Sequence, residues 1–300
     1  MLLQQNITES KAGEFYDLED LQLNLDPATG RRSTSWGNLG YWPAGSNGTG
    51  NEDITYARAG QTLAIQLANM AELDELASDH IVVDTGFGCG DQLIEWNQSF
   101  KVTRLYGINY SKPQTLFAQN LITRKGIQDF HLAQGDCCAA NAWASIPGEV
   151  DRIIALDCLY HFHDKSRYFA NCQDKLAFNG VMAVSDLLLQ GPLSNPFYKL
   201  ALRLICKLSN IPYSNLQTLE DYEQNLRKHG LKLVSSRDIS EHVFLPFGDW
   251  LKVYINQIKD LNIEGQKLSW SKYKGTASFL RWVYKKRILS YRLMQIAKAH

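Results

Sequence analysis

The stretch Val82-Val83-Asp84-Thr85-Gly86-Phe87-Gly88-Cys89-Gly90-Asp91-Gln92 places three alternate glycines between a short apolar run and a segment that continues as Leu93, Ile94 and Trp96. The apolar run predicts a buried strand, and the segment after the glycines predicts a helix. Glycine suits such a turn because the backbone bends tightly there and a ligand approaches without meeting a Cβ atom. We therefore expect a strand, a ligand-binding turn and a helix.

Short β-branched or apolar runs alternate with helical patterns through the rest of the chain. The predicted strands are Ile81–Asp84, Arg104–Asn109, Phe130–Ala133, Arg152–Leu156, Val181–Leu187 and Leu231–Ile239. This alternation predicts an α/β fold, a Rossmann-like, doubly wound and mostly parallel sheet with helices on both faces. A helix capped within Asn51–Asp53 is expected before the first strand. The last run, Tyr291–Ala297, could be a closing edge strand or the end of a basic helix.

The predicted units are an irregular arm, a ligand-binding core and a helical lid in two pieces. We assign residues 1–54 to the arm, 55–190 to the core, 191–217 to a lid insertion, 218–240 to the core again, and 241–300 to a second lid segment with a basic C-terminal segment. Insertions after the later strands of an open sheet tend to lie over its carboxyl edge, where ligands bind.

The two lid pieces and the arm carry many aromatic and apolar residues. These are Phe197, Tyr198, Leu202, Ile205, Tyr213, Phe244, Phe247, Trp250 and Tyr254 in the lid, with Trp36, Tyr41 and Trp42 in the arm. They supply enough surface to enclose an apolar or amphiphilic molecule, although we expect half of them to form the core of the lid itself.

Composition excludes several classes of protein. The 31 basic residues balance the 31 acidic ones among 300, so there is no excess positive charge to bind a nucleic acid. No apolar run approaches the roughly 20 residues that span a bilayer, and the first residues lack the pattern of a secretion signal. The six cysteines show no paired Cys-x-x-Cys spacing. We therefore expect reduced thiols, no metal site and a cytoplasmic protein.

Charge is unevenly distributed. Residues 265–300 hold nine basic residues and no acidic one, which leaves a net charge of −9 on the rest of the chain. Such a segment could touch an anionic membrane surface, making the protein weakly peripheral, or an acidic partner. It could equally be an ordinary solvated face.

The glycine turn differs from the dinucleotide fingerprint, which requires a third glycine where this chain has Asp91. Asp84 followed by Gly-x-Gly-x-Gly instead resembles the first motif of class I S-adenosylmethionine-dependent methyltransferases. Asn109, 25 residues after Asp84, lies where most members have an acidic residue against the ribose. Its amide can accept one hydroxyl without the strength of a charged acceptor. The longer string Gly107-Ile108-Asn109-Tyr110-Ser111, with Gln114, resembles the sterol, tocopherol and cyclopropane-synthase-like branch.

The resemblance implies S-adenosyl-L-methionine as the cofactor and a set of residues that bind it. The set is Gly86, Gly88, Gly90, Gln92, Asn109, Tyr110, Gln114, Asp136 and Cys137. Within it, Asp136 would hold the adenine amino group and the Cys137 N–H would bond the ring. Asp136 could instead cap the following turn.

The segment after the fourth strand, Asp157-Cys158-Leu159-Tyr160-His161-Phe162-His163, resembles the part of small-molecule methyltransferases in which a histidine faces the methyl acceptor. Histidine suits the removal of a hydroxyl proton at neutral pH. His161 is the first candidate base, His163 is its rival, and Asp186 could orient the ring. Asp157 could cap a helix, and Tyr160 could donate to the acceptor.

These residues predict a methyltransferase that acts on a small apolar or amphiphilic acceptor, at a hydroxyl oxygen before carbon or nitrogen, in natural-product biosynthesis. One alternative is an NAD(P)-dependent oxidoreductase on a similar sheet, which Asp91 and Asn109 disfavour. A second is a non-catalytic S-adenosylmethionine-binding partner protein. The sequence does not indicate an oligomeric state.

Overall fold

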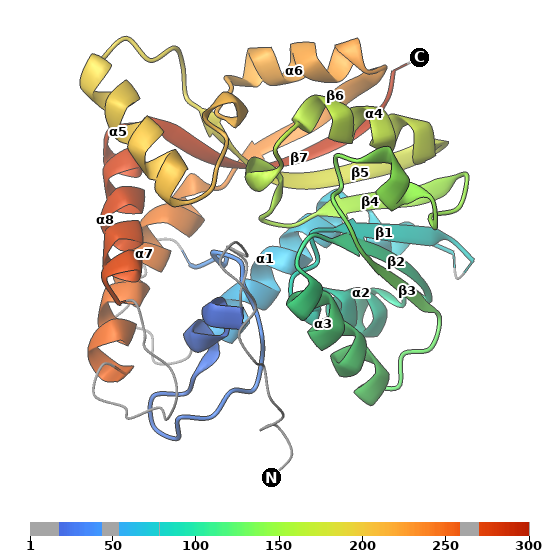
Figure 1. Cartoon of the computed structure of the whole chain (residues 1–300), viewed down its shortest axis with the longest axis horizontal. Helices are drawn as coiled ribbons and strands as arrows, with labels where there is room; N and C mark the ends of the chain where they lie inside the picture. The colour runs from blue at the N-terminus through green and yellow to red at the C-terminus, as the bar shows by residue number, and fades with distance from the viewer. Residues whose placement is uncertain (1–17, 44–53, 78, 259–269, 300) are drawn as a thin grey trace.

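A computed structural model describes residues 18–43, 54–77, 79–258 and 270–299. Its centre is a seven-stranded sheet in the order β3-β2-β1-β4-β5-β7-β6, in which β7 alone runs antiparallel to its neighbours (Figure 1). The strands are β1 (Ile81–Thr85), β2 (Arg104–Asn109), β3 (Phe130–Gln134), β4 (Val150–Ala155), β5 (Leu176–Leu189), β6 (Leu231–Asp238) and β7 (Leu289–Lys298). The predicted doubly wound, mostly parallel α/β fold is confirmed.

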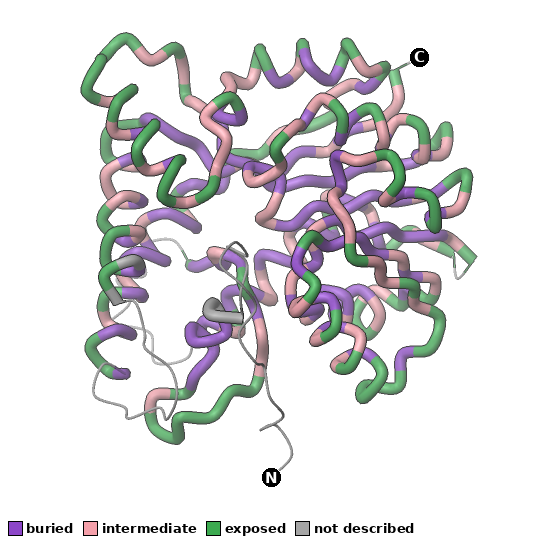
Figure 2. Tube along the Cα trace, in the orientation of Figure 1, coloured by how far each residue is buried: buried purple, intermediate pink, exposed green. Residues whose placement is uncertain are grey.

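Helices cover both faces of the sheet. The helices of one face are α1 (Tyr56–Met70), α2 (Asp91–Phe100) and α3 (Lys112–Arg124), and those of the other are α4 (Lys165–Lys175) and α6 (Leu219–Lys228). Strands β1 and β4 are buried almost throughout, so their side chains supply both apolar layers (Figure 2). Fully buried β-branched runs of this kind are typical of parallel strands covered on both sides.

Side chains at the helix starts fix where several helices begin. Thr55, Ser111, Asp164 and Thr218 each accept a hydrogen bond from a backbone N–H in the first turn of α1, α3, α4 and α6. Such caps satisfy donors that have no partner inside the helix. Helix α1 is therefore capped by Thr55 and not within Asn51–Asp53, which lies outside the described residues.

The lid lies beyond the later strands. It contains α5 (Pro196–Leu208), α7 (Ser240–Ile258) and α8 (Trp270–Lys285), of which α7 and α8 pack together. Short 3₁₀ turns complete the structure; they cover Leu18–Asn24 (η1), Leu73–Glu75 (η2), Ala140–Trp143 (η3), Leu159–His161 (η4) and Tyr213–Asn215 (η5).

The arm is tied to α1 and α7 by an aromatic cluster. The Trp250 ring lies 5.4 Å from that of Trp42, 5.0 Å from Tyr56 and 4.7 Å from Tyr254. The Trp42 N–H also donates to the His242 carbonyl. Five aromatic residues of the predicted set are buried in this part of the structure, namely Trp36, Trp42, Phe244, Phe247 and Tyr254, whereas Phe197 is 79% exposed.

Two expectations about the strands differ from the structure. Strand β5 begins at Leu176, directly after α4, and so starts five residues before the predicted strand Val181–Leu187. The last strand is not at an edge, because β7 pairs with β5 on one side and β6 on the other. The end of the C-terminal segment thus belongs to the core sheet. Among the described residues, no helix has the length and apolarity to cross a membrane.

Candidate active site

The residues predicted to bind the donor gather at the carboxyl ends of β1, β2 and β3, and the candidate acceptor residues follow β4. Because these four strands are parallel and adjacent, the chain turns that follow them meet at one edge of the sheet (Figure 1). Ligands of open α/β sheets bind at this edge, next to the point where the strand order reverses. Here that point lies between β1 and β4.

The three glycines of the first turn have different surroundings, although all have positive φ. A Cβ atom on Gly86 would lie 2.6 Å from the Cys158 sulfur, and one on Gly90 would lie 2.8 Å from the Ala118 Cβ. A Cβ atom on Gly88 would meet no atom of the described residues within 4 Å. Gly86 and Gly90 are therefore required for packing, and Gly88 is the glycine that faces open space.

Asp84 at the end of β1 is held by the helix that follows the turn. The Gln92 Nε2 donates to both carboxylate oxygens at 3.0 Å, and the Trp96 Nε1 donates to one of them at 2.6 Å. Complete burial raises the pKa of Asp84 to about 7, although these hydrogen bonds oppose the shift. The Gln92 amide nitrogen thus binds Asp84 instead of facing the donor, which corrects its predicted role.

Asn109 ends β2 with its side chain 5% exposed. Its Nδ2 donates to the Gln114 Oε1 at 3.1 Å, which orients the amide. Among the described residues, no donor reaches the Asn109 Oδ1. A buried amide oxygen held in this way is suited to accept a ribose hydroxyl. Tyr110, next in the chain, is exposed, so its contribution to binding stays a prediction.

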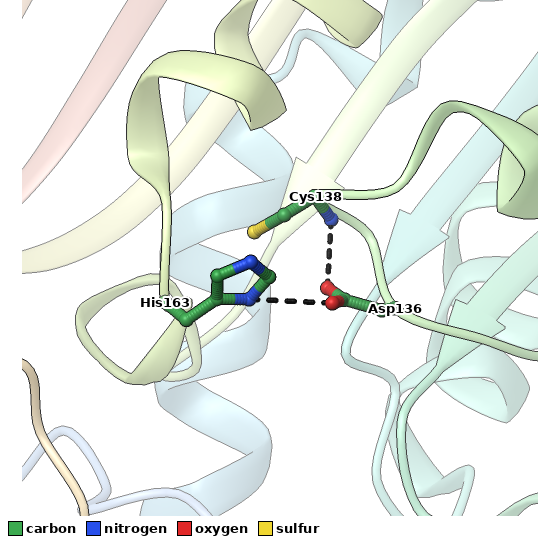
Figure 3. Close-up of side chains that lie close together, drawn as sticks. All are labelled: Asp136, Cys138 and His163. Carbon is green, nitrogen blue, oxygen red and sulfur yellow. Dashed lines mark hydrogen bonds and ion pairs between the residues drawn. The ribbon is translucent and has the colours of Figure 1, made fainter.

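Asp136 and His163 lie together after β3 (Figure 3). The Asp136 Oδ2 is 3.2 Å from the His163 Nδ1, and its Oδ1 accepts the Cys138 N–H. The Cys138 sulfur completes a group of three potential metal ligands within 4.8 Å of one another. The predicted turn-capping role of Asp136 is thus present. The Cys137 N–H has no acceptor among the described residues, so it could still bond an adenine ring.

His161 lies on the other side of the post-β4 turn. Its Nδ1 is 3.3 Å from the Asn210 carbonyl oxygen, in the segment that follows α5. A carbonyl can only accept, so this contact favours the tautomer in which Nδ1 carries the proton and Nε2 carries the lone pair. The two histidines therefore contact different segments, His161 the lid and His163 the turn after β3.

The structure does not bring Asp186 to His161, which corrects the predicted pair. The Asp186 Oδ2 accepts from the Lys165 Nζ at 2.6 Å, and both side chains are almost fully buried. The Lys165 Nζ also donates to the Asn215 carbonyl. Burial raises the pKa of Asp186 and lowers that of Lys165, and the attraction between them opposes both shifts.

A second buried group, which the sequence pattern did not indicate, surrounds Asp157. Its Oδ1 accepts from the hydroxyls of Tyr160 at 2.8 Å and Tyr291 at 2.7 Å, and its Oδ2 accepts the Leu39 N–H. Asp157 therefore connects the arm and β7 to the end of β4 through hydrogen bonds. It has a φ of 54° and does not cap a helix. Tyr291 lies 134 residues from Asp157, and no local motif marks it.

Three points at this edge have no partner among the described residues and are open to a ligand. These are the space at Gly88, the Asn109 amide oxygen and the Cys137 N–H. They follow three adjacent parallel strands, β1, β2 and β3, and whether they hold the donor stays a prediction.

Comparison with known proteins shows which family the chain resembles. A family model described as mycolic acid cyclopropane synthetase matches residues 52–280. The chain is 29% identical to erythromycin 3''-O-methyltransferase of Saccharopolyspora erythraea over 228 residues, which cover 74% of this chain and 69% of that protein. It is 25% identical to methyltransferase GfsG of Streptomyces halstedii over 231 residues, which cover 77% of this chain and 76% of that protein.

Solved structures share the fold at low identity. Geranyl diphosphate C-methyltransferase from Streptomyces coelicolor A3(2) matches with a TM-score of 0.66 and 14% identity, over 94% of this chain and 98% of that chain. The [4+2]-cyclase SpnF matches with a TM-score of 0.66 and 17% identity, over 96% of this chain and 94% of that chain.

Proposed function

Since this chain belongs to the mycolic acid cyclopropane synthetase family and is an S-adenosylmethionine-dependent methyltransferase of the small-molecule type, we propose that it methylates a hydroxyl oxygen. The acceptor is an apolar or amphiphilic natural product. The observation that carries the proposal is the position of His161. This histidine lies in the turn after β4, and its Nδ1 is held by the backbone carbonyl of Asn210. The similarity to an O-methyltransferase that acts on erythromycin supports a hydroxyl acceptor.

The bound donor would supply an electrophilic methyl group on its sulfonium sulfur, and the bond between that carbon and the sulfur would break to leave the neutral thioether S-adenosylhomocysteine. His161 would accept the proton of the acceptor hydroxyl on Nε2 as the oxygen forms its bond to the methyl carbon. Water later removes that proton from the imidazolium. The Asn210 carbonyl would stabilise the imidazolium as well as orient the neutral ring, because it accepts from the Nδ1–H in both states.

Asp186 and Lys165 support the base indirectly. Lys165 donates to the Asn215 carbonyl, and the Asn215 Nδ2 donates to the carbonyls of Tyr160 and Phe162 on either side of His161. The buried pair thus fixes the backbone of the turn that carries the base. We assign both residues a positioning role.

The apolar acceptor is inferred from the elements around this turn. The arm reaches the end of β4 through Leu39, and α7 lies behind it with its aromatic cluster. A site bordered by such side chains excludes water from the reacting atoms and favours a large, mainly apolar molecule with few polar groups. Macrolides that carry a sugar with an unmethylated hydroxyl are the first class to test.

The first prediction concerns His161. With labelled donor and a panel of glycosylated macrolides, we expect the wild type to methylate at least one acceptor. His161→Ala should lower its single-turnover rate by about 10²–10⁴-fold, the usual contribution of a positioned base. Donor affinity, measured by calorimetry, should stay unchanged.

His163→Ala is the matched control. Its partner is Asp136, so we expect altered donor affinity with little change in the rate at saturating donor. A His161→Ala enzyme with the wild-type rate and pH profile would remove His161 from the mechanism. Methyl transfer to carbon or nitrogen of the same panel would contradict the hydroxyl acceptor and leave the methyltransferase assignment intact.

A further inference from the structure

The outer face of lid helix α5 is unusually apolar. Phe197, Leu200, Leu204 and Leu208 are 79%, 68%, 57% and 67% exposed. Their spacing of three and four residues places them in one row along the helix. The opposite face of the helix is buried through Leu202 and Cys206, so this row, which we call the α5 stripe, is not required for packing the lid.

A row of positive charge runs beside the α5 stripe. Lys199, Arg203 and Lys207 are exposed, and each precedes a leucine of the stripe by one residue. At this spacing of four residues they form a second row next to the first. Residues 189–219 contain no Asp or Glu, so no acidic side chain of this segment neutralises the row.

The neighbouring helix brings further basic residues close to α5. The Tyr198 ring on α5 contacts the Trp282 ring on α8 at 5.4 Å, which brings the end of α8 next to α5 (Figure 1). Lys285, Lys286 and Arg287 follow Trp282 within about one and a half turns and are exposed. Lys285 and Arg287 line a pocket together with Asp238 and Glu241, which offset part of their charge, so the row on α5 remains the main positive surface.

We propose that α5 docks on the surface of an anionic lipid bilayer, with the α5 stripe inserted between the acyl chains and the basic rows against the headgroups. A short amphipathic helix with bulky apolar residues on one side and Lys and Arg beside them is suited to lie in the plane of a membrane interface. A second copy of this chain is a poorer occupant, because two stripes in contact would bring their basic rows together. The docking does not depend on which atom of the acceptor is methylated.

The test uses the full chain and sedimentation with vesicles. We expect the wild type to sediment with vesicles of phosphatidylcholine and phosphatidylglycerol, and much less with phosphatidylcholine alone. Leu200→Ser with Leu204→Ser should lower the partition coefficient on the anionic vesicles about tenfold or more, since two inserted apolar side chains are lost. Lys199→Gln with Lys207→Gln should lower it similarly and remove the preference for anionic lipid.

Leu116→Ser is the matched control, because Leu116 is 50% exposed on α3 and lies outside the α5 stripe. It should sediment like the wild type. All variants should keep the wild-type circular dichroism and donor affinity, because the changed side chains are exposed. The proposal is overturned if the wild type ignores both kinds of vesicle, or if the double leucine variant sediments like the wild type. A concentration-dependent dimer that the same variant abolishes would also overturn it and assign the stripe to a second copy.

Discussion

Three glycines that look equivalent in the sequence play two different parts at the turn after β1. Gly86 and Gly90 allow close packing against Cys158 and Ala118, whereas Gly88 borders open space. The sequence correctly indicated a turn that only glycine could form. It did not distinguish packing from ligand approach, because that depends on residues up to 72 positions away in the chain.

Substitution of Gly90 and of Gly88 by alanine should distinguish the packing role from the ligand-approach role. Gly90→Ala combines a φ of 95° with a 2.8 Å contact, so we expect a loss of roughly 3 kcal/mol in the free energy of unfolding. Gly88→Ala should cost only about 1 kcal/mol of left-handed strain, yet weaken donor binding at least tenfold by filling the approach path. Urea unfolding and calorimetry measure the two effects. A stable Gly88→Ala variant with wild-type affinity would contradict the donor position.

Asp84 should make stability depend on pH. Its pKa is about 7 in the folded protein against the ordinary value of 3.8 in the unfolded chain, so between these values the folded state binds more protons. The free energy of unfolding therefore falls as pH rises from about 4 to about 7, by up to about 1.4 kcal/mol per pH unit. Compared with Asp84→Asn, the wild type should lose stability across this window in urea unfolding. Asp91, whose pKa is also raised, is present in both proteins, so its effect cancels from the difference in unfolding free energy. If the unfolding free energies of the two proteins depended on pH in the same way, a buried, titrating Asp84 would be contradicted.

The sequence predicted where the site residues lie better than it predicted their hydrogen-bond partners. Asn109 and His161 follow β2 and β4, where the motifs placed them. The contacts that orient these two side chains were less predictable. Gln114 was in the predicted set, but the Asn210 carbonyl was not. A contact made by a backbone atom does not depend on residue type, so the sequence could not indicate it. Asp186 was assigned to the wrong partner because Lys165, in the first turn of a helix, resembles an ordinary surface residue.

At the scale of elements, the pair of Lys165 and Asp186 joins α4 to β5, and Lys165 also binds η5. Lys165→Met should cost about 3–5 kcal/mol in unfolding free energy, since it leaves a buried carboxylate without its partner. The double variant Lys165→Met with Asp186→Leu should recover most of that loss. Both single and double variants should keep the pH profile of methyl transfer, because neither residue touches the base. A shifted pH profile in Asp186→Asn alone would return Asp186 to the role of orienting His161.

Strand positions were predicted well where a strand is buried on both faces, as in β1, β2 and β4, because an apolar run is then sufficient evidence. Prediction failed at the two sides of β5. Its first residues continue directly from α4 and include Asn179 and Gly180, which are poor strand formers, so the predicted strand started five residues late. Strand β7 alternates apolar residues with Arg292 and Gln295, a pattern that suits an edge equally well.

At the scale of the whole molecule, the C-terminal strand is structural. Deleting residues 289–300 would remove the neighbour of both β5 and β6 and the Tyr291 hydroxyl that Asp157 binds. We expect the truncated chain to lose cooperative unfolding and donor binding together. Truncation after Lys298 should be tolerated, because β7 ends there. Circular dichroism during heating compares the two; a folded, donor-binding product of the longer deletion would contradict the central place of β7.

The interior position of β7 also affects the order in which the sheet can fold during synthesis. The strands that carry the glycine turn, Asn109 and the post-β4 turn are complete once the chain has passed β5, whereas β6 has no strand partner in the described sheet until β7 has left the ribosome. We expect the donor half of the sheet to fold on the nascent chain while β6 stays unpaired until β7 emerges. Ribosome-bound chains arrested before residue 289 should then show protease resistance up to β5 and cleavage beyond it, so that synthesis itself makes donor binding possible before the acceptor side is closed.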